Sequence, residues 1–266
     1  MNLDAFARHL SQELGLAEST IAVYSRMVAN YQKWLGQRPE TPELAAKYIA
    51  TFPGDNTRSV VASALRTYFA WAHPDTPLKV RVKVPQSLPK PITRGELWLL
   101  VRGAEGSLKI LILLMAFAGL RVTEACELRS SSILQDNQAL RILGKGRKER
   151  LIPIPRTLHA IFKAQVQGRR VGSPVFPGQG RRTFLSRYTV EHALSALGDK
   201  VGVHGMHPHR LRHFYASWRY ALTKDAFLVA REMGHSDPKT TYGYAGLVQV
   251  PVGIECMEDL LKEVLA

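Results

Sequence analysis

The chain has 266 residues, 45% of them hydrophobic, which is enough to bury a full core and to form one large domain or two ordinary ones. Lysine and arginine outnumber aspartate and glutamate by 36 to 22, so the formal net charge is +14 at pH 7. This composition excludes a disordered basic tail. It leaves two interpretations, a folded protein that binds a polyanion or a protein with a solvated basic surface.

The N-terminal part of the chain has the period of amphipathic helices. Apolar side chains recur every three or four positions in three segments, which are residues 18–36, 41–52 and 57–72. Threonine opens the second and third segments, and Gly36 can end the first. We therefore predict a small all-helical domain over residues 1–74.

A proline-rich segment follows this domain. Residues 75–92 combine prolines with basic residues and lack a helical period, so we expect an extended linker. Lys79, Arg81 and Lys83 alternate along it and are candidate contacts to a DNA backbone.

The second predicted domain covers residues 93–266 and is mainly helical. Residues 110–120 form an uninterrupted apolar run, which is typical of a buried helix. Two short β-like runs, 138–143 and 150–154, are joined by a basic loop and predict a hairpin. The expected fold is thus mainly α with a small β-hairpin or sheet, in two domains. Further helices are expected in residues 93–105, 187–200, 209–223, 224–234 and 253–266.

Three features that the sequence lacks indicate in which cellular compartment the protein works. The apolar run at 110–120 is shorter than the roughly twenty residues that a membrane span needs, so we expect no membrane contact. The N-terminus lacks the apolar core of a signal peptide. Only Cys126 and Cys256 are present, too few for a disulfide framework or a four-cysteine zinc site. We expect a cytoplasmic protein, which is associated with the nucleoid if the polyanion that it binds is DNA.

Arg121 follows Gly119-Leu120 at the start of a new helical run, where free backbone N–H groups favour an anion. A guanidinium there could bind a phosphate through two parallel hydrogen bonds. On this segment alone a structural salt bridge with Glu124 or Glu127 is the favoured interpretation.

Residues 208–223 separate into two helix faces. One face is apolar, whereas His209, Arg212 and His213 gather on the other. Pro208 suits the first helical position, so His209 and Arg212 are expected near the helix N-terminus. These two side chains could then bind the same ligand. The alternative is that they form a cationic face exposed to solvent.

The basic loop of the predicted hairpin carries four cations, Lys145, Arg147, Lys148 and Arg150. Glycines at 144 and 146 allow a sharp turn that exposes the tip. Contact with phosphates without chemistry is the favoured interpretation of such a hairpin in isolation.

In combination these residues resemble the catalytic domain of the tyrosine recombinases, with Xer-like and simple phage integrases nearest. The resemblance covers residues 89 to 246 by motif, and the N-terminal helices resemble that family's DNA-binding core-binding domain in type and length only. The ordered set consists of Arg121, Lys145, His209, Arg212, His235 and a tyrosine shortly after.

The resemblance implies that a tyrosine attacks a phosphodiester of duplex DNA and forms a 3′-phosphotyrosyl link, without a metal or another cofactor. His209 is then the acid/base partner of the tyrosine, with His213 as its rival. Arg121 and Arg212 bind the non-bridging phosphate oxygens. Lys145, with Lys148 as its rival, protonates the leaving 5′-oxygen, and His235 hydrogen-bonds the phosphate.

Two tyrosines, Tyr242 and Tyr244, are candidates for the nucleophile. In a helix they lie about 200° apart, so only one of them can face the phosphate. Propensity does not choose between them. In the family that the chain resembles, the nucleophile is the ninth residue after the histidine at 235, which is Tyr244.

The resemblance also implies a homotetramer on paired DNA sites. Its C-terminal helix, with an apolar stripe in residues 253–266, would dock into a neighbouring copy, and folding back onto its own domain is the alternative. Two other functions stay open. They are a type IB-like topoisomerase and a sequence-specific DNA-binding regulator that does not cleave.

Overall fold

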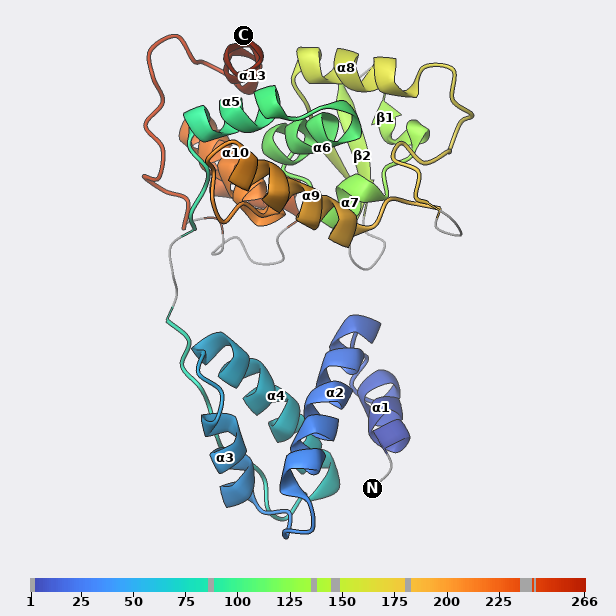
Figure 1. Ribbon diagram of the computed structural model, residues 1–266, viewed down its shortest axis with the longest axis vertical. Helices are drawn as coiled ribbons and strands as arrows, with labels where there is room; N and C mark the ends of the chain where they lie inside the picture. Colours follow the sequence, from blue (N-terminus) through green and yellow to red (C-terminus); the bar gives the residue numbers. More distant parts are fainter. Residues whose placement is uncertain are drawn as a thin grey trace. The chain divides into compact units, whose positions relative to one another are not determined.

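The computed structural model describes residues 3–85, 89–134, 138–144, 149–179, 183–234, 241 and 243–266. The chain divides into two compact units, Met1–Ser87 and Leu88–Ala266, which we call the N-terminal unit and the C-terminal unit (Figure 1). The expected class, mainly helical with one small sheet, is confirmed.

The N-terminal unit is a helical bundle built around aromatic side chains. Phe6 and Tyr68 are fully buried and meet edge to face, with ring centroids 5.4 Å apart. Tyr31 and Phe69 complete the centre of this core. Its described helices are α1 (Leu3–Gln12), α2 (Glu18–Leu35), α3 (Pro42–Ala50) and α4 (Asp55–Ala72).

The expected helix ends are partly confirmed. Gly36 ends α2 with a φ of 61°, a conformation that glycine adopts without strain. Thr41 caps α3 by accepting a hydrogen bond from the Leu44 amide. The expected start of the next helix is wrong by one half turn, because α4 begins at Asp55 with Gly54 before it.

The first half of the expected linker packs against the N-terminal unit. Leu78 is buried against the core of the N-terminal unit, and Val80 and Val82 are partly buried there. Because side chains alternate along an extended segment, the residues between them face outward. The exposed side chains are Lys79, Arg81 and Lys83.

The C-terminal unit surrounds the buried helix α6 (Gly106–Phe117), whose residues from Leu111 to Phe117 are all buried. Helix α10 (Pro208–Thr223) packs against it, with Phe117 and Phe214 in edge contact. The other helical elements among the described residues are α5 (Arg94–Gly103), α7 (Val122–Cys126), the 3-10 turn η1 (Ser130–Ser132), α8 (Arg156–Val166), α9 (Arg187–Lys200), α11 (Ala226–Met233) and α13 (Met257–Leu265).

The sheet is antiparallel and has the order β1-β2-β3, with β1 (Ile133–Leu134), β2 (Ala139–Leu143) and β3 (Glu149–Pro153). The expected hairpin is present, since β2 pairs with β3 and Leu140 lies opposite Ile152. Both of these side chains are buried, whereas Leu151 points outward. This alternation decides which way Arg150 points, as described below.

Helix α13 lies on its own unit, against α5 and α8 (Figure 1). Polar contacts hold it there. Arg94 pairs with Glu263 at 2.7 Å, and the Thr157 hydroxyl donates to Glu258. In the single chain the helix thus folds back onto its own unit, which is the alternative stated above, and docking into a neighbouring copy stays a prediction. Its buried side chains are Met257, Leu260, Leu261 and Val264.

Across the described residues, no helix combines the length and the apolar character that crossing a membrane requires. The most apolar helix, α6, has 12 residues and is covered by the other helices of the C-terminal unit.

Candidate active site

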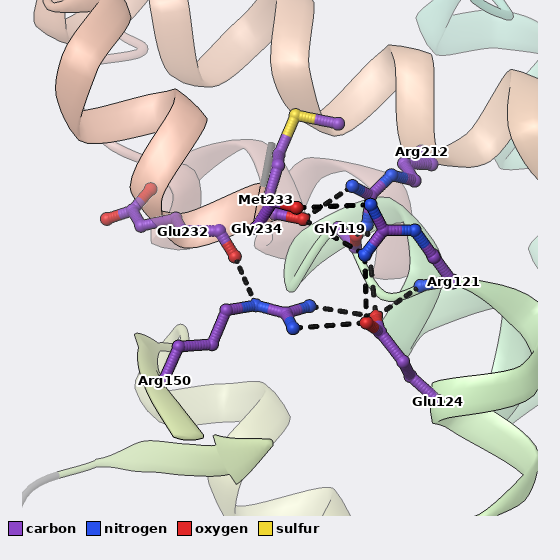
Figure 2. Close-up of polar contacts among 8 residues, drawn as sticks. All are labelled: Gly119, Arg121, Glu124, Arg150, Arg212, Glu232, Met233 and Gly234. Carbon is purple, nitrogen blue, oxygen red and sulfur yellow. Dashed lines mark hydrogen bonds and ion pairs between the residues drawn. The ribbon is translucent and has the colours of Figure 1, made fainter. Parts of the chain in front are cut away.

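Two of the expected arginines converge at the C-terminal end of α11, although they come from different elements. Arg121 precedes α7, and Arg212 lies in α10. Arg121 Nη2 donates to the Gly234 carbonyl at 3.2 Å, and Arg212 Nη2 donates to the Met233 carbonyl at 2.5 Å (Figure 2). The end of α11 thus holds both guanidinium groups in one place.

The carboxylate of Glu124 lies below these arginines and is 7% exposed. One oxygen accepts from the Arg121 amide at 2.8 Å, and the other accepts from Arg121 Nη1 at 3.0 Å. Arg212 Nη1 is 3.9 Å away. The salt bridge that the isolated segment favours is therefore present. It occupies only part of the Arg121 guanidinium, since that side chain stays 36% exposed.

The third guanidinium at Glu124 is that of Arg150. We expected Arg150 to belong to an exposed cationic loop, but it is the second residue of β3 and lies on the same face as buried Ile152. Its side chain is 10% exposed and binds both oxygens of Glu124, at 3.0 and 2.8 Å (Figure 2). The prediction that Arg150 belongs to an exposed loop that contacts DNA is therefore corrected, because its side chain is turned inward and bound to Glu124.

The charge at this cluster is unbalanced. Three guanidinium groups, from Arg121, Arg150 and Arg212, surround the single carboxylate of Glu124. Burial, and after it the nearby Arg121 charge, lower the pKa of Arg212 to about 10, so crowding of like charges adds to the cost of desolvation. An anion bound at the exposed edge of Arg121 would offset this excess.

Glu124 is held ionised by its partners. Burial raises the pKa of its carboxyl group, but the hydrogen bonds from Arg150 and from the Arg121 amide outweigh burial. The pKa therefore lies below its ordinary value.

Tyr244 is 4% exposed, and its hydroxyl lies 2.8 Å from Nδ1 of His213 in α10. Burial raises the pKa of Tyr244, and the charge of Arg212 opposes this increase. Burial also lowers the pKa of His213 to about 4, helped by the nearby histidines. A neutral imidazole has one bare nitrogen, so His213 can accept the phenol proton.

His209 was the expected partner of the tyrosine, and the structure places it one turn away. Its ring centroid is 6.4 Å from that of His213. Partial burial and the charges of Arg212 and Arg121 lower the pKa of His209. His209 is thus near the arginines, while the described contact with the tyrosine hydroxyl belongs to His213.

The expected two-faced character of α10 is partly wrong. Leu211 and Phe214 are buried on the apolar face as expected. Arg212, expected on a solvated or ligand-binding face, is 4% exposed because the end of α11 covers it. Arg212 Nη1 also donates to the Gly119 carbonyl at 2.5 Å.

A buried glutamate that the sequence did not single out fixes α11 against α10. Glu232 is 2% exposed and accepts two hydrogen bonds from Arg219, at 2.9 and 2.7 Å. The Tyr215 hydroxyl donates to it at 2.8 Å. Because Met233 follows Glu232 directly, this network also fixes the carbonyl that holds Arg212. Glu232 shares the buried face of α11 with Val229, and this spacing is the signal that could have revealed it.

Gly119 is a close-packed position of this site. It has a φ of +62°, and a Cβ added there would meet the Tyr215 ring at 2.4 Å. We expect Gly119→Ala to lower the free energy of unfolding by about 2 to 5 kcal/mol, from backbone strain and overpacking together. We also expect weaker function, since the Gly119 carbonyl holds Arg212. Chemical denaturation measures the first effect.

Gly106→Ala is the matched control. Gly106 has a φ of +52° but nothing within 4 Å of an added Cβ, so only the backbone strain of about 1 to 2 kcal/mol remains. Equal losses at the two positions would contradict the role of the Tyr215 contact.

The remaining expected residues divide into two groups. The exposed cations of the N-terminal unit, Lys79, Arg81 and Lys83, have side chains open to solvent. Four others lie outside the described residues, namely Lys145, Arg147, Lys148 and His235. Among the residues that are described, no group of three or more His, Cys, Asp or Glu side chains could hold a metal ion.

Comparison with known proteins identifies a matching family and similar sequences. The model of the phage integrase family matches residues 100–249. Tyrosine recombinase XerA of Pyrococcus horikoshii is 32% identical over an alignment of 253 residues, which covers 91% of this chain and 87% of the relative. Tyrosine recombinase XerD of Rhizobium meliloti is 27% identical and covers 98% of this chain and 93% of its own.

Solved structures with the same fold include recombinases bound to DNA. A lambda integrase fragment, as a dimer on a COC′ core site, has a TM-score of 0.73 at 18% identity and covers 95% of this chain and 98% of its own. XerH in a post-cleavage complex with its difH substrate has a TM-score of 0.70 at 17% identity, over 92% and 80%. At these identities the likeness concerns the fold.

Proposed function

Because the chain belongs to the phage integrase family, the tyrosine-type site-specific DNA recombinases, we propose that it cleaves and rejoins duplex DNA through a covalent 3′-phosphotyrosyl intermediate on Tyr244. The observation that carries this proposal is the 2.8 Å contact between the Tyr244 hydroxyl and the neutral imidazole of His213, beside Arg212, whose charge opposes the increase in the tyrosine pKa that burial causes.

The first step is attack by the tyrosine oxygen. The phenol loses its proton to His213, its oxygen bonds to phosphorus, and the bond from phosphorus to the 5′-oxygen breaks. Tyrosine ionises near pH 10, so forming phenolate at pH 7 costs about 4 kcal/mol or more. Proton transfer during attack avoids the full cost, because the charge passes directly onto a phosphate in the field of the arginines.

The arginines bind the non-bridging oxygens in this proposal. Arg121 offers its exposed edge, and Arg212 supports the charge that develops in the pentacoordinate transition state. Arg212 donates to the Gly119 and Met233 carbonyls when DNA is absent. Its position is thus set before the substrate arrives.

The leaving 5′-oxygen needs a proton, since an alkoxide is a much poorer leaving group than a phenolate. We assign this role to Lys145, and phosphate contacts to His209 and His235. Arg147, Lys148 and the exposed cations of residues 79–83 would contact the DNA backbone. No metal or organic cofactor takes part in this scheme.

We further propose that four copies act together on two DNA sites. A lambda integrase tetramer bound to a Holliday junction is among the solved structures of the same fold, with a TM-score of 0.73, and supports this proposal. Helix α13 would join the copies only after leaving α5 and α8, against which it packs in the single chain.

A nicked duplex tests the proposed chemistry. The duplex is first selected from a randomised pool by binding to the chain. It is then nicked beside the cleavage position, so that the short leaving strand diffuses away. We expect an adduct that survives denaturing electrophoresis and forms equally well in EDTA, together with complexes of four copies on two unnicked duplexes.

Other outcomes would favour other functions. Binding without any adduct would indicate a DNA-binding regulator. Relaxation of a supercoiled plasmid that lacks the selected sequence, without strand exchange between two sites, would indicate a topoisomerase. Loss of the adduct in EDTA would contradict a metal-free reaction.

A further inference from the structure

Arg150 connects three elements of the site. It lies on β3, its Nη atoms bind Glu124 of α7, and its Nε donates to the Glu232 carbonyl of α11 at 2.9 Å (Figure 2). Three of the five N–H donors of the guanidinium are thus used within the protein. Two donors remain, but the side chain is only 10% exposed, which leaves little surface for a phosphate contact by Arg150.

The place of Arg150 along the chain adds to this observation. It is the second residue of β3, two positions after the basic loop 145–148, and it pairs across the ladder with Ile142 of β2. Strand β3, which follows the loop that carries Lys145 in the sequence, is therefore linked through Arg150 to Glu124, the carboxylate that pairs with Arg121. No other described residue of β2 or β3 forms a side-chain ion pair with α7 or a side-chain hydrogen bond to α11.

We propose that Arg150 is a positioning residue for cleavage, which orients the Glu124 carboxylate and, through it, the Arg121 guanidinium, and which fixes the base of the Lys145 hairpin. This inference rests on the proposed function. Arg150 touches neither the DNA nor the reacting atoms.

The charges around Glu124 support this role. The groups that face its carboxylate come from α7, β3 and α10, and they are Arg121, Arg150 and Arg212. Among these described contacts, only that of Arg150 is bidentate, with one Nη atom on each carboxylate oxygen. Without it the carboxylate keeps one side-chain and one backbone hydrogen bond, both from Arg121, and loses its only two-pronged contact.

Arg150→Ala and Arg150→Lys test the inference on the selected nicked duplex. We expect adduct formation in a single turnover, at saturating protein, to slow about 100-fold for Ala, because small displacements of catalytic groups have effects of this size. For Lys we expect about tenfold, since lysine keeps the charge but loses the fork. The affinity for the unnicked duplex and its salt dependence should match the wild type.

Arg141→Ala is the matched control. Arg141 lies on neighbouring β2, is exposed, and pairs across the ladder with outward-facing Leu151. This variant removes the same charge from the same hairpin without touching Glu124. We expect its single-turnover rate to equal that of the wild type.

A double mutant separates positioning from a general loss of structure. In Glu124→Gln the carboxylate that Arg150 orients is absent, so adding Arg150→Ala should slow cleavage much less than it does in the wild type. Thermal unfolding of every variant shows which chains are folded. If Arg150→Ala does not fold, Arg150→Lys carries the test.

Two results would overturn the inference. One is wild-type cleavage by folded Arg150→Lys or Arg150→Ala at saturating protein. The other is a weaker affinity whose salt dependence falls by about one counterion, which is the signature of a lost phosphate contact. If the wild-type chain itself forms no adduct, the proposed function fails instead, so the two failures are distinguishable.

Discussion

Tyr244→Phe is expected to form no covalent adduct on the nicked duplex, while its affinity for the unnicked duplex stays within about twofold of wild type. The variant lacks the oxygen that would attack phosphorus. It also loses the hydrogen bond to His213, which contributes only about 1 kcal/mol to stability, so the chain should stay folded. Denaturing electrophoresis of labelled DNA measures the adduct, and thermal unfolding checks the fold.

Tyr242→Phe is the matched control for this substitution. Tyr242 is two residues earlier in the chain and carries the same reactive group. We expect this variant to form the adduct at a rate close to that of the wild type. An adduct formed by Tyr244→Phe, or one lost only in Tyr242→Phe, would overturn the assignment of the nucleophile.

Arg212→Lys should slow single-turnover cleavage by about 100- to 1,000-fold, the range seen when a donor that stabilises a developing oxyanion is removed. Lysine keeps the positive charge, but it lacks the planar set of donors with which arginine binds the Gly119 and Met233 carbonyls and a phosphate at the same time. Affinity for the unnicked duplex should change far less than the rate, because the loss falls mainly on the transition state.

Arg210→Lys provides the comparison for that variant. Arg210 lies two residues earlier in α10, and its guanidinium pairs with Glu96 of α5 at 3.2 Å, away from the tyrosine. We expect a rate within a few-fold of wild type. Equal losses for the two variants would mean that α10 as a whole, rather than the Arg212 guanidinium, limits the reaction.

Periodicity predicts the long helices well, because each buries a stripe of several turns. Helices α1 and α8 are missing from the prediction, and each buries a single pair one turn apart. These pairs are Phe6 with Leu10 in α1, and Leu158 with Phe162 in α8. A stripe of two residues does not distinguish a helix from an irregular segment. Strand β1 has only two residues and is equally invisible to periodicity.

The candidate site is predictable in its residue types but not in its contacts. Arg121, Arg212 and Tyr244 follow from motif order, and the structure brings all three into one part of the C-terminal unit. The contact between His213 and Tyr244 joins residues 31 positions apart, and no local pattern encodes such a distance. In the sequence, His209 and His213 are equivalent neighbours on one helix face.

Arg150 shows how a local rule could have corrected a prediction. Composition assigns it to the basic loop, but alternation from buried Ile152 assigns its side chain to the inner face of β3. Its partner Glu124 lies 26 positions away, so periodicity predicts the direction of the side chain but not the ion pair.

Tyr244 becomes bonded to DNA in the proposed reaction, and mapping the linked residue tests this most directly. Trypsin would release the segment from Thr240 to Lys262, which contains both Tyr242 and Tyr244. Fragmentation of this peptide by mass spectrometry then locates the attached nucleotide. We expect the mass of a 3′-linked nucleotide on Tyr244, whereas a nucleotide on Tyr242, or on any other residue of the chain, would contradict the account.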